Sequence, residues 1–175
     1  MLIIVPTPLG NLEDITARCL TALREADLIL CEDTRRTIKL LSHYSISKRL
    51  VRYNEHSERS LDEAIGYLRL GKKVALVSDG GTPCISDPGR KLVALARAEG
   101  LPVESLPGPS AVTAAVALSG FHGGGFVFEG FLPRKSGARR RRLTELAGLS
   151  LAVVLFEAPN RLTRLLSELG EVFGD

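Results

Sequence analysis

The fold is decided by residues 74–89, which read VALVSDGGTPCISDPG. Residues Val74 to Val77 are apolar, as expected for a strand that is buried on both faces of a parallel sheet. The remainder, Ser78 to Gly89, combines polar residues with glycine and proline and predicts a long loop. Asp87 and Pro88 then predict the cap and the first turn of a helix from Gly89 to Glu99.

The same order of strand, loop and helix continues on both sides of this stretch. Asn11 predicts the cap of a helix with Ile15, Cys19 and Leu23 on one face, and residues 60–63 read as a capping box. Short apolar runs predict further strands at residues 2–5, 28–31, 50–53 and 103–106. Helices are predicted around residues 36–42 and from 110 to 119. This alternation predicts an α/β domain with a mainly parallel sheet.

A glycine run at residues 121–125 interrupts this alternation. Such a run is typical of irregular backbone, and it predicts a boundary between two lobes. Beyond it, strands are predicted at 126–131 and 151–156, and helices at 139–146 and 159–169. The predicted organisation is an N-terminal lobe over residues 1–120 and a partial, incomplete second lobe over residues 121–175.

Composition excludes several classes of protein. Hydrophobic residues make up 45% and charged residues 25% of the 175 residues, which excludes disordered and collagen-like chains. The apolar runs are far shorter than the roughly 20 residues that span a bilayer, and the N-terminus resembles a first strand more than a signal peptide. The 3 cysteines form no C-x-x-C pair. We therefore expect a cytoplasmic protein with reduced thiols, no membrane association and no metal site.

Basic residues gather in one short stretch. The net charge is only +3, but residues 134–142 read RKSGARRRR and contain no acidic residue. Such a run forms either a solvated surface or a patch that binds the phosphates of a nucleic acid. Composition does not choose between the two.

Polar and glycine-rich loops follow the predicted strands. Ligands of open α/β sheets bind at the carboxyl ends of the strands, so loops on that edge predict a binding cleft. The loops lie at residues 7–11, 32–36, 54–56, 78–89 and 107–111 in the first lobe, and at 157–161 in the second.

All of these loops except 54–56 lie in stretches that resemble the tetrapyrrole methylase superfamily. The similar stretches, in family order along nearly the whole chain, are TPLGNLEDIT (7–16), ADLILCEDTRRT (26–37), VALVSDGGTPCISDPG (74–89), LPGPSAVTAAVALSG (106–120), FEGFLPRK (128–135) and FEAPNRL (156–162). The family usually has alanine where Gly80 stands and histidine where Asn160 stands. The resemblance implies the two-lobed, non-Rossmann fold of class III methyltransferases, with S-adenosylmethionine as cofactor. It also implies further strands after residue 175, so we expect a truncated chain.

The EDTR and SDGGTP stretches are similar to one branch of this family. That branch implies 2′-O-methylation of a cytidine ribose in the decoding region of small-subunit ribosomal RNA, and a homodimer. The implied partner is therefore the ribosomal RNA or the assembled small subunit. Carried over residue by residue, the resemblance implies that the cofactor is bound by Pro8, Leu9, Asp79, Gly81, Thr82, Ile85, Ser110, Ala111 and Phe156.

Methyl transfer to a hydroxyl needs in-line placement and a group that accepts the proton. The sequence offers three candidates on neighbouring loops, namely Asp33, Glu55 and His56, and does not choose among them. Guanidinium groups bind phosphate bidentately. The candidates for substrate binding are Arg35, Arg36, Lys135, Arg139 and Arg140.

Two alternatives stay open. The first is a methylase of a tetrapyrrole-like small molecule, which needs an aromatic acceptor pocket, whereas aromatic residues make up only 5% of the chain. The second is a catalytically silent RNA-binding fragment. Calorimetry with S-adenosylmethionine separates the second from the enzyme, because a silent module need not bind the cofactor.

Overall fold

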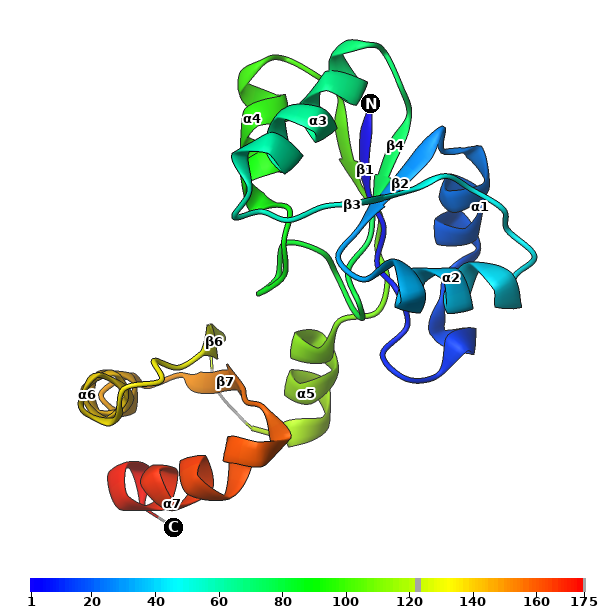
Figure 1. Cartoon of the computed structure of the whole chain (residues 1–175). Coiled ribbons are helices and arrows are strands. Elements are labelled where there is room, and N and C mark those ends of the chain that lie inside the picture. Colours follow the sequence, from blue (N-terminus) through cyan, green and yellow to red (C-terminus); the bar gives the residue numbers. More distant parts are fainter. Residues whose placement is uncertain (122–123, 175) are drawn as a thin grey trace. The chain divides into compact units, whose positions relative to one another are not determined.

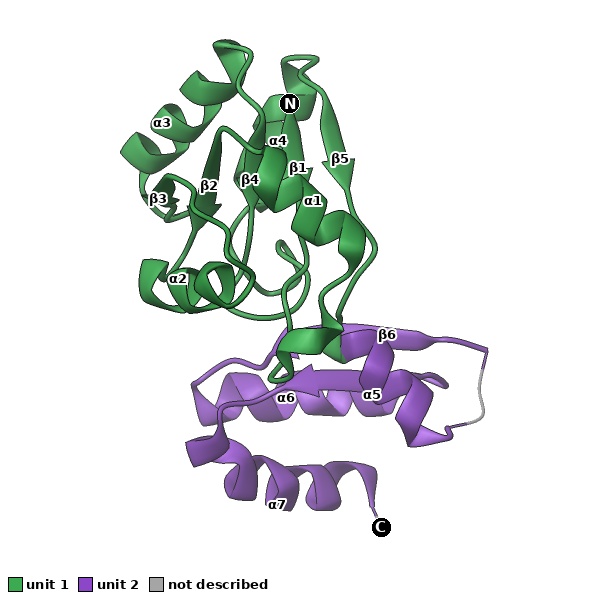
Figure 2. Ribbon diagram, turned by 90° about the vertical axis from the view of Figure 1, so that its right-hand side faces the viewer, with its two compact units in different colours: residues 1–111 green, residues 112–175 purple. Residues whose placement is uncertain are grey.

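The computed structural model describes residues 1–121 and 124–174. His122 and Gly123, in the glycine run, lie outside the described residues, as does Asp175. The chain divides into two compact units, residues 1–111 and 112–175 (Figure 2). This boundary lies one helix earlier than residue 120, because the apolar cores of the sheet end at Leu106 along the chain.

The first unit is built on a sheet of 5 parallel strands in the order β3-β2-β4-β1-β5. Its strands are β1 (Leu2–Ile4), β2 (Leu28–Cys31), β3 (Leu50–Arg52), β4 (Val74–Leu76) and β5 (Val103–Ser105). Its helices are the 3₁₀ turn η1 (Leu12–Asp14), α1 (Ala17–Glu25), α2 (Thr34–His43), α3 (Glu58–Arg69) and α4 (Arg90–Ala98). The predicted parallel α/β architecture is confirmed.

Helices cover both faces of this sheet (Figure 1). Ile3 and Ile29 point to the face covered by α1 and α2, where Leu23 and Leu41 complete one core. Leu2 and the alternate residues of the other strands point to the face covered by α3 and α4. Burial of strand residues on both faces explains why these strands read as continuous apolar runs.

The caps predicted for three helices differ from those of the structure. Asn11 caps only the 3₁₀ turn, and α1 begins later because the Thr16 side chain accepts a hydrogen bond from the Cys19 N–H. Ser57, not Ser60, caps α3. Gly89 is the N-cap of α4 and makes no side-chain cap, so Asp87 and Pro88 do not have the predicted capping role.

The second unit combines two parallel strands with three α-helices and a 3₁₀ turn. Its elements are α5 (Ala111–Ser119), β6 (Phe126–Phe131), α6 (Ser136–Ala147), β7 (Ala152–Phe156), the 3₁₀ turn η2 (Pro159–Arg161) and α7 (Leu162–Phe173). Leu143 and Leu146 of α6 and Leu165 of α7 pack on Val153 and form its core. No helix within the described ranges is long and apolar enough to cross a membrane.

Candidate active site

The loops that the sequence singles out in the first unit lie at one edge of its sheet (Figure 2). All five strands are parallel, so their carboxyl ends meet at the same edge. The loop after β4, residues 77–89, lies centrally because β4 is the middle strand. This edge is therefore the candidate site.

The β4 loop is hydrogen-bonded to the loops after β1 and β5. The backbones of Thr7 and Gly81 exchange two hydrogen bonds, N···O 2.9 and 2.8 Å, and the Thr7 hydroxyl donates to the Ser78 carbonyl at 3.0 Å. On the other side, the Thr82 hydroxyl donates to the Pro109 carbonyl at 3.0 Å. The loops after β1, β4 and β5 therefore form one rigid framework.

Glycine is required at the centre of this framework. Gly81 has φ +85°, and a Cβ there would lie 3.2 Å from the Leu9 side chain. The left-handed backbone is costly for any other residue, by roughly 1–2 kcal/mol. A Cβ on Gly80 would lie 3.3 Å from the Pro8 carbonyl oxygen. The predicted cofactor residues Pro8, Leu9 and Gly81 are thus brought together.

The rest of the β4 loop is strained. Cys84 and Ser86 have φ values of +71° and +62°, in a region that residues other than glycine seldom occupy. Such backbone persists only where surrounding structure imposes it, and it concentrates at functional sites. Ile85, between them, is 40% exposed.

Asp79 carries an unsatisfied buried acceptor. Its Oδ2 pairs with Arg36 Nε at 3.5 Å, whereas its Oδ1 is buried and has no hydrogen-bond partner among the described residues. Buried polar atoms are nearly always hydrogen-bonded, so an orphaned acceptor at the edge of a loop framework indicates a missing donor.

A second aspartate of this loop, Asp87, is protonated more easily than usual. Its burial, together with the nearby carboxylates of Glu32 and Asp79, raises its pKa to about 6. The sequence pattern around Asp87 predicts only a helix cap. Its burial depends on how the strained loop folds back, and no local pattern in the sequence signals that.

Two of the three candidate proton acceptors are engaged elsewhere. Asp33 caps α2, and both of its oxygens accept from Arg35, which lowers its pKa to about 2. Glu55 accepts hydrogen bonds from the backbone N–H groups of Gly89, at 2.5 Å, and Arg90, at 3.2 Å. Glu55 therefore supplies the cap that α4 lacks.

The third candidate, His56, is exposed, and its backbone N–H donates to the Asn54 side chain at 3.0 Å. The predicted cofactor residues Ser110 and Ala111 are half-buried where the β5 loop enters α5. Phe156 belongs to the second unit, where its ring meets those of Phe128 and Phe131 at centroid distances of 4.9 and 5.7 Å.

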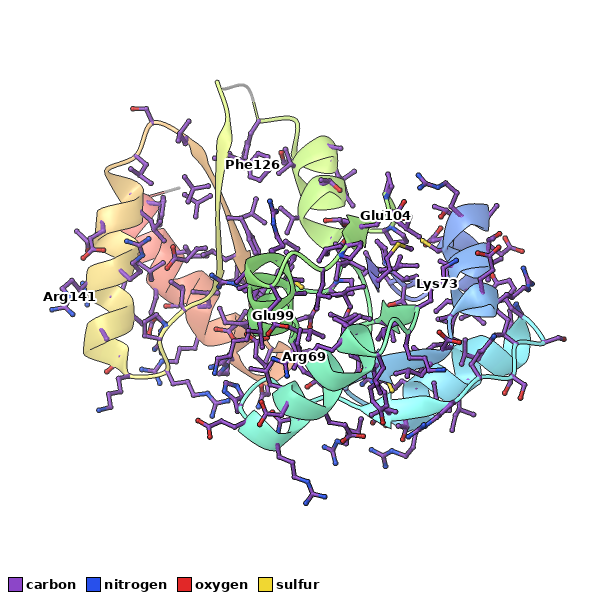
Figure 3. All side chains as sticks on the ribbon, turned by 90° about the horizontal axis from the view of Figure 1, so that it is seen from above. Arg69, Lys73, Glu99, Glu104, Phe126 and Arg141 are labelled. Atoms are coloured by element: carbon purple, nitrogen blue, oxygen red, sulfur yellow. The ribbon has the colours of Figure 1, made fainter. Side chains whose placement is uncertain are left out.

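The basic run divides into side chains held by Glu168 or Glu129 and side chains that are exposed. Arg139 is buried, and its guanidinium donates to both Glu168 oxygens at 2.5 and 2.6 Å. Arg142 pairs with Glu129 at 2.7 Å. In contrast, Arg134, Lys135, Arg140 and Arg141 are exposed, and Arg141 projects away from α6 (Figure 3). Of the exposed side chains, Arg140 also pairs with Glu171 at 3.4 Å. A phosphate contact by Arg139 would have to break its buried pair.

Among the described residues, no group of three or more acidic, histidine or cysteine side chains is arranged to hold a metal ion. Cys19, Cys31 and Cys84 are free.

Residues 1–175 match the family of tetrapyrrole (corrin/porphyrin) methylases. The ribosomal RNA small subunit methyltransferase I of Thermotoga maritima is 54% identical over 175 residues, covering 99% of this chain and 78% of that protein. The proteins of the same name from Neisseria meningitidis serogroup A and Vibrio cholerae are each 46% identical, over 98% and 99% of this chain. The chain spans only 60% and 61% of their respective lengths.

Solved structures agree on the fold. Cobalt precorrin-4 methyltransferase aligns with a TM-score of 0.71 at 20% identity, over 98% of this chain and 74% of its own. Uroporphyrin-III C-methyl transferase from Thermus thermophilus, complexed with S-adenyl homocysteine, gives a TM-score of 0.69 at 20% identity, over 99% and 77%. With the match over its full length and relatives at this level of identity, the chain belongs to the tetrapyrrole methylase family.

Proposed function

We propose that this chain methylates the 2′-hydroxyl of a cytidine ribose in the decoding region of small-subunit ribosomal RNA. The names of relatives at 54% and 46% identity support ribosomal RNA as the substrate. The choice of ribose and of cytidine follows from the similarity of the EDTR and SDGGTP stretches to that branch of the family. The three free cysteines fit work in the cytoplasm, where thiols stay reduced.

S-adenosylmethionine is the methyl donor, and the residues of the sheet edge fit it. The observation that carries the proposal is Asp79 Oδ1, a buried acceptor that lacks a donor among the described residues. An ammonium or hydroxyl group of the cofactor would supply that donor. Gly80 and Gly81 let the backbone of this loop lie close to Pro8 and Leu9, which an added Cβ would contact. When bound, the cofactor supplies an electrophilic methyl group on a sulfonium sulfur.

The framework of loops would position the reactants, which accounts for much of the acceleration of a methyl transfer. Asp87 is the proposed proton acceptor, added to the three candidates from the sequence. A general base works best when its pKa lies near the working pH, and Asp87, at about 6, meets this better than Asp33, at about 2. Glu55 is occupied by α4, and His56 stays a candidate.

Exposed basic side chains would hold the RNA. Arg36 in the first unit and Lys135 and Arg140 in the second have side chains at the surface. Arg36 and Arg140 make only long, exposed ion pairs, with Asp79 at 3.5 Å and Glu171 at 3.4 Å. Arg35 is exposed but donates to Asp33, so its release for phosphate would cost that pair. We assign phosphate contacts to the exposed members of this set rather than to Arg139.

One observation favours a second candidate, a tetrapyrrole-like acceptor. The second unit gathers 4 of the chain's 6 phenylalanines on β6 and β7, and Phe126 and Phe131 are 43% and 53% exposed. Aromatic faces of this kind suit a planar macrocycle as well as a base.

Methyl transfer to isolated small ribosomal subunits tests the proposal. With radiolabelled S-adenosylmethionine, we expect label in the RNA, recovered after nuclease digestion as 2′-O-methylcytidine. Label in protein or on a base, or label that enters an added tetrapyrrole and not the RNA, would contradict it. RNA binding without any cofactor binding would identify the silent fragment.

A further inference from the structure

The second unit contains a pocket that has been given no role so far. It has a volume of about 550 Å³ and lies where β7 leads through η2 into α7. Its polar lining consists of Arg134, Arg139, Glu157, Asn160, Arg161 and Arg164.

Positive charge exceeds negative charge around this pocket. Arg161 pairs with Glu157, whose side chain is only 6% exposed. Arg139 and Arg164 share Glu168, and the Arg164 contact is 3.1 Å long. Arg134 adds a fourth guanidinium group. The region therefore holds four guanidinium groups and only two carboxylates.

Arg134 is the guanidinium best placed to accept a ligand. Its side chain has no hydrogen bond or ion pair within the described part of the chain, and it is exposed. Its backbone is held in place, because Arg139 Nη1 donates to the carbonyls of Pro133, at 3.3 Å, and Arg134, at 2.9 Å. Arg164 is also accessible, with 65% of its side chain exposed.

We propose that this pocket binds a phosphodiester group of the RNA backbone through Arg134 and Arg164, an inference that rests on the proposed function. A guanidinium fork matches two phosphate oxygens, and an excess of two positive charges suits an anion rather than a neutral ligand. The Asn160 amide adds a neutral hydrogen-bonding group in the same pocket.

The test measures how salt affects binding of a labelled single-stranded RNA to the full chain. The variant Arg134→Gln/Arg164→Gln should bind at least tenfold more weakly. Its slope of log affinity against log salt should be shallower by roughly 0.7 for each lost contact. The control, Lys72→Gln/Arg97→Gln, removes the same charge from exposed positions of the first unit, and its slope should stay unchanged. Circular dichroism checks that both variants fold.

The outcomes separate the two proposals. If the unaltered chain binds and methylates RNA but the pocket variant keeps its slope, the pocket inference is overturned and the proposed function stands. Equal losses of RNA affinity in the pocket variant and the control would also overturn it. General electrostatic attraction between the chain and the RNA would then explain binding. If the unaltered chain binds no RNA, both proposals fail.

Discussion

At the scale of the residue, the pKa values of two carboxylates at the sheet edge are shifted in opposite directions. Arg35 holds the pKa of Asp33 down to about 2, whereas burial and the carboxylates of Glu32 and Asp79 raise that of Asp87 to about 6. Environments that separate the pKa values of neighbouring groups are typical of catalytic sites. The charged form of Asp87, which the proposed function needs, therefore lowers the free energy of unfolding.

The pKa of Asp87 predicts the pH dependence of a substitution. Because its folded pKa lies above the usual 3.8, the folded state loses stability as pH rises from about 4 to about 6. Asp87→Asn should therefore stabilise the protein by about 1 kcal/mol at pH 8, after allowance for solvent screening, and by little at pH 4. Urea unfolding followed by circular dichroism measures this, with exposed Asp62→Asn as the control. A variant less stable than the parent at pH 8 would contradict it.

At the scale of the element, one buried ion pair joins the helices of the second unit. Arg139 of α6 has a side chain only 7% exposed, and Glu168 of α7 accepts from it through both oxygens. That contact lowers the pKa of Glu168 to about 2. The stability that the pair contributes is therefore present above about pH 4.5 and is lost as pH falls towards 2.

Removal of one partner leaves the other charge buried. Glu168→Gln should lower the free energy of unfolding by about 3 kcal/mol at pH 7. Glu171→Gln on the same helix breaks the exposed pair with Arg140, 3.4 Å long, and should cost about 0.5 kcal/mol or less. Thermal unfolding by circular dichroism compares the two. Equal losses of unfolding free energy in the two variants would contradict the larger contribution predicted for the buried pair.

Features of the elements that depend on local sequence could be predicted, and those that depend on tertiary contacts could not. The strand from Leu28 to Cys31 is as predicted, because an apolar run between polar loops needs only local information. The start of α4 is not, since its N–H groups are capped by Glu55, from a different part of the chain. The loops of the site were predictable for the same local reason. The engagement of Asp33 and Glu55, and the burial of Asp87 and Arg139, depend on tertiary contacts.

At the scale of the whole molecule, apolar surface on α5 supports the predicted homodimer. Leu118 of α5 is 89% exposed, and Phe121, two residues beyond the end of the helix, is 76% exposed. Val112 is the buried residue of this helix. A second copy of the chain would cover such a surface, and an obligate interface buries at least about 2,000 Å² in total. Light scattering at micromolar concentration should give twice the mass of one chain. Leu118→Lys should shift it towards the monomer, and a monomeric parent would refute the prediction.

Calorimetric titration with S-adenosylmethionine tests the central claim, that the framework of loops at the sheet edge binds the cofactor. Gly81→Val forces a side chain against Leu9 and strains the backbone bridge to Thr7, so affinity should fall at least tenfold, about 1.4 kcal/mol. Gly71→Val is the matched control, because Gly71 also has positive φ, +74°, but an added Cβ there meets nothing within 4 Å and the residue lies between α3 and β4. It should bind as the parent does. Equal affinity of the folded Gly81→Val protein and its parent would contradict the account.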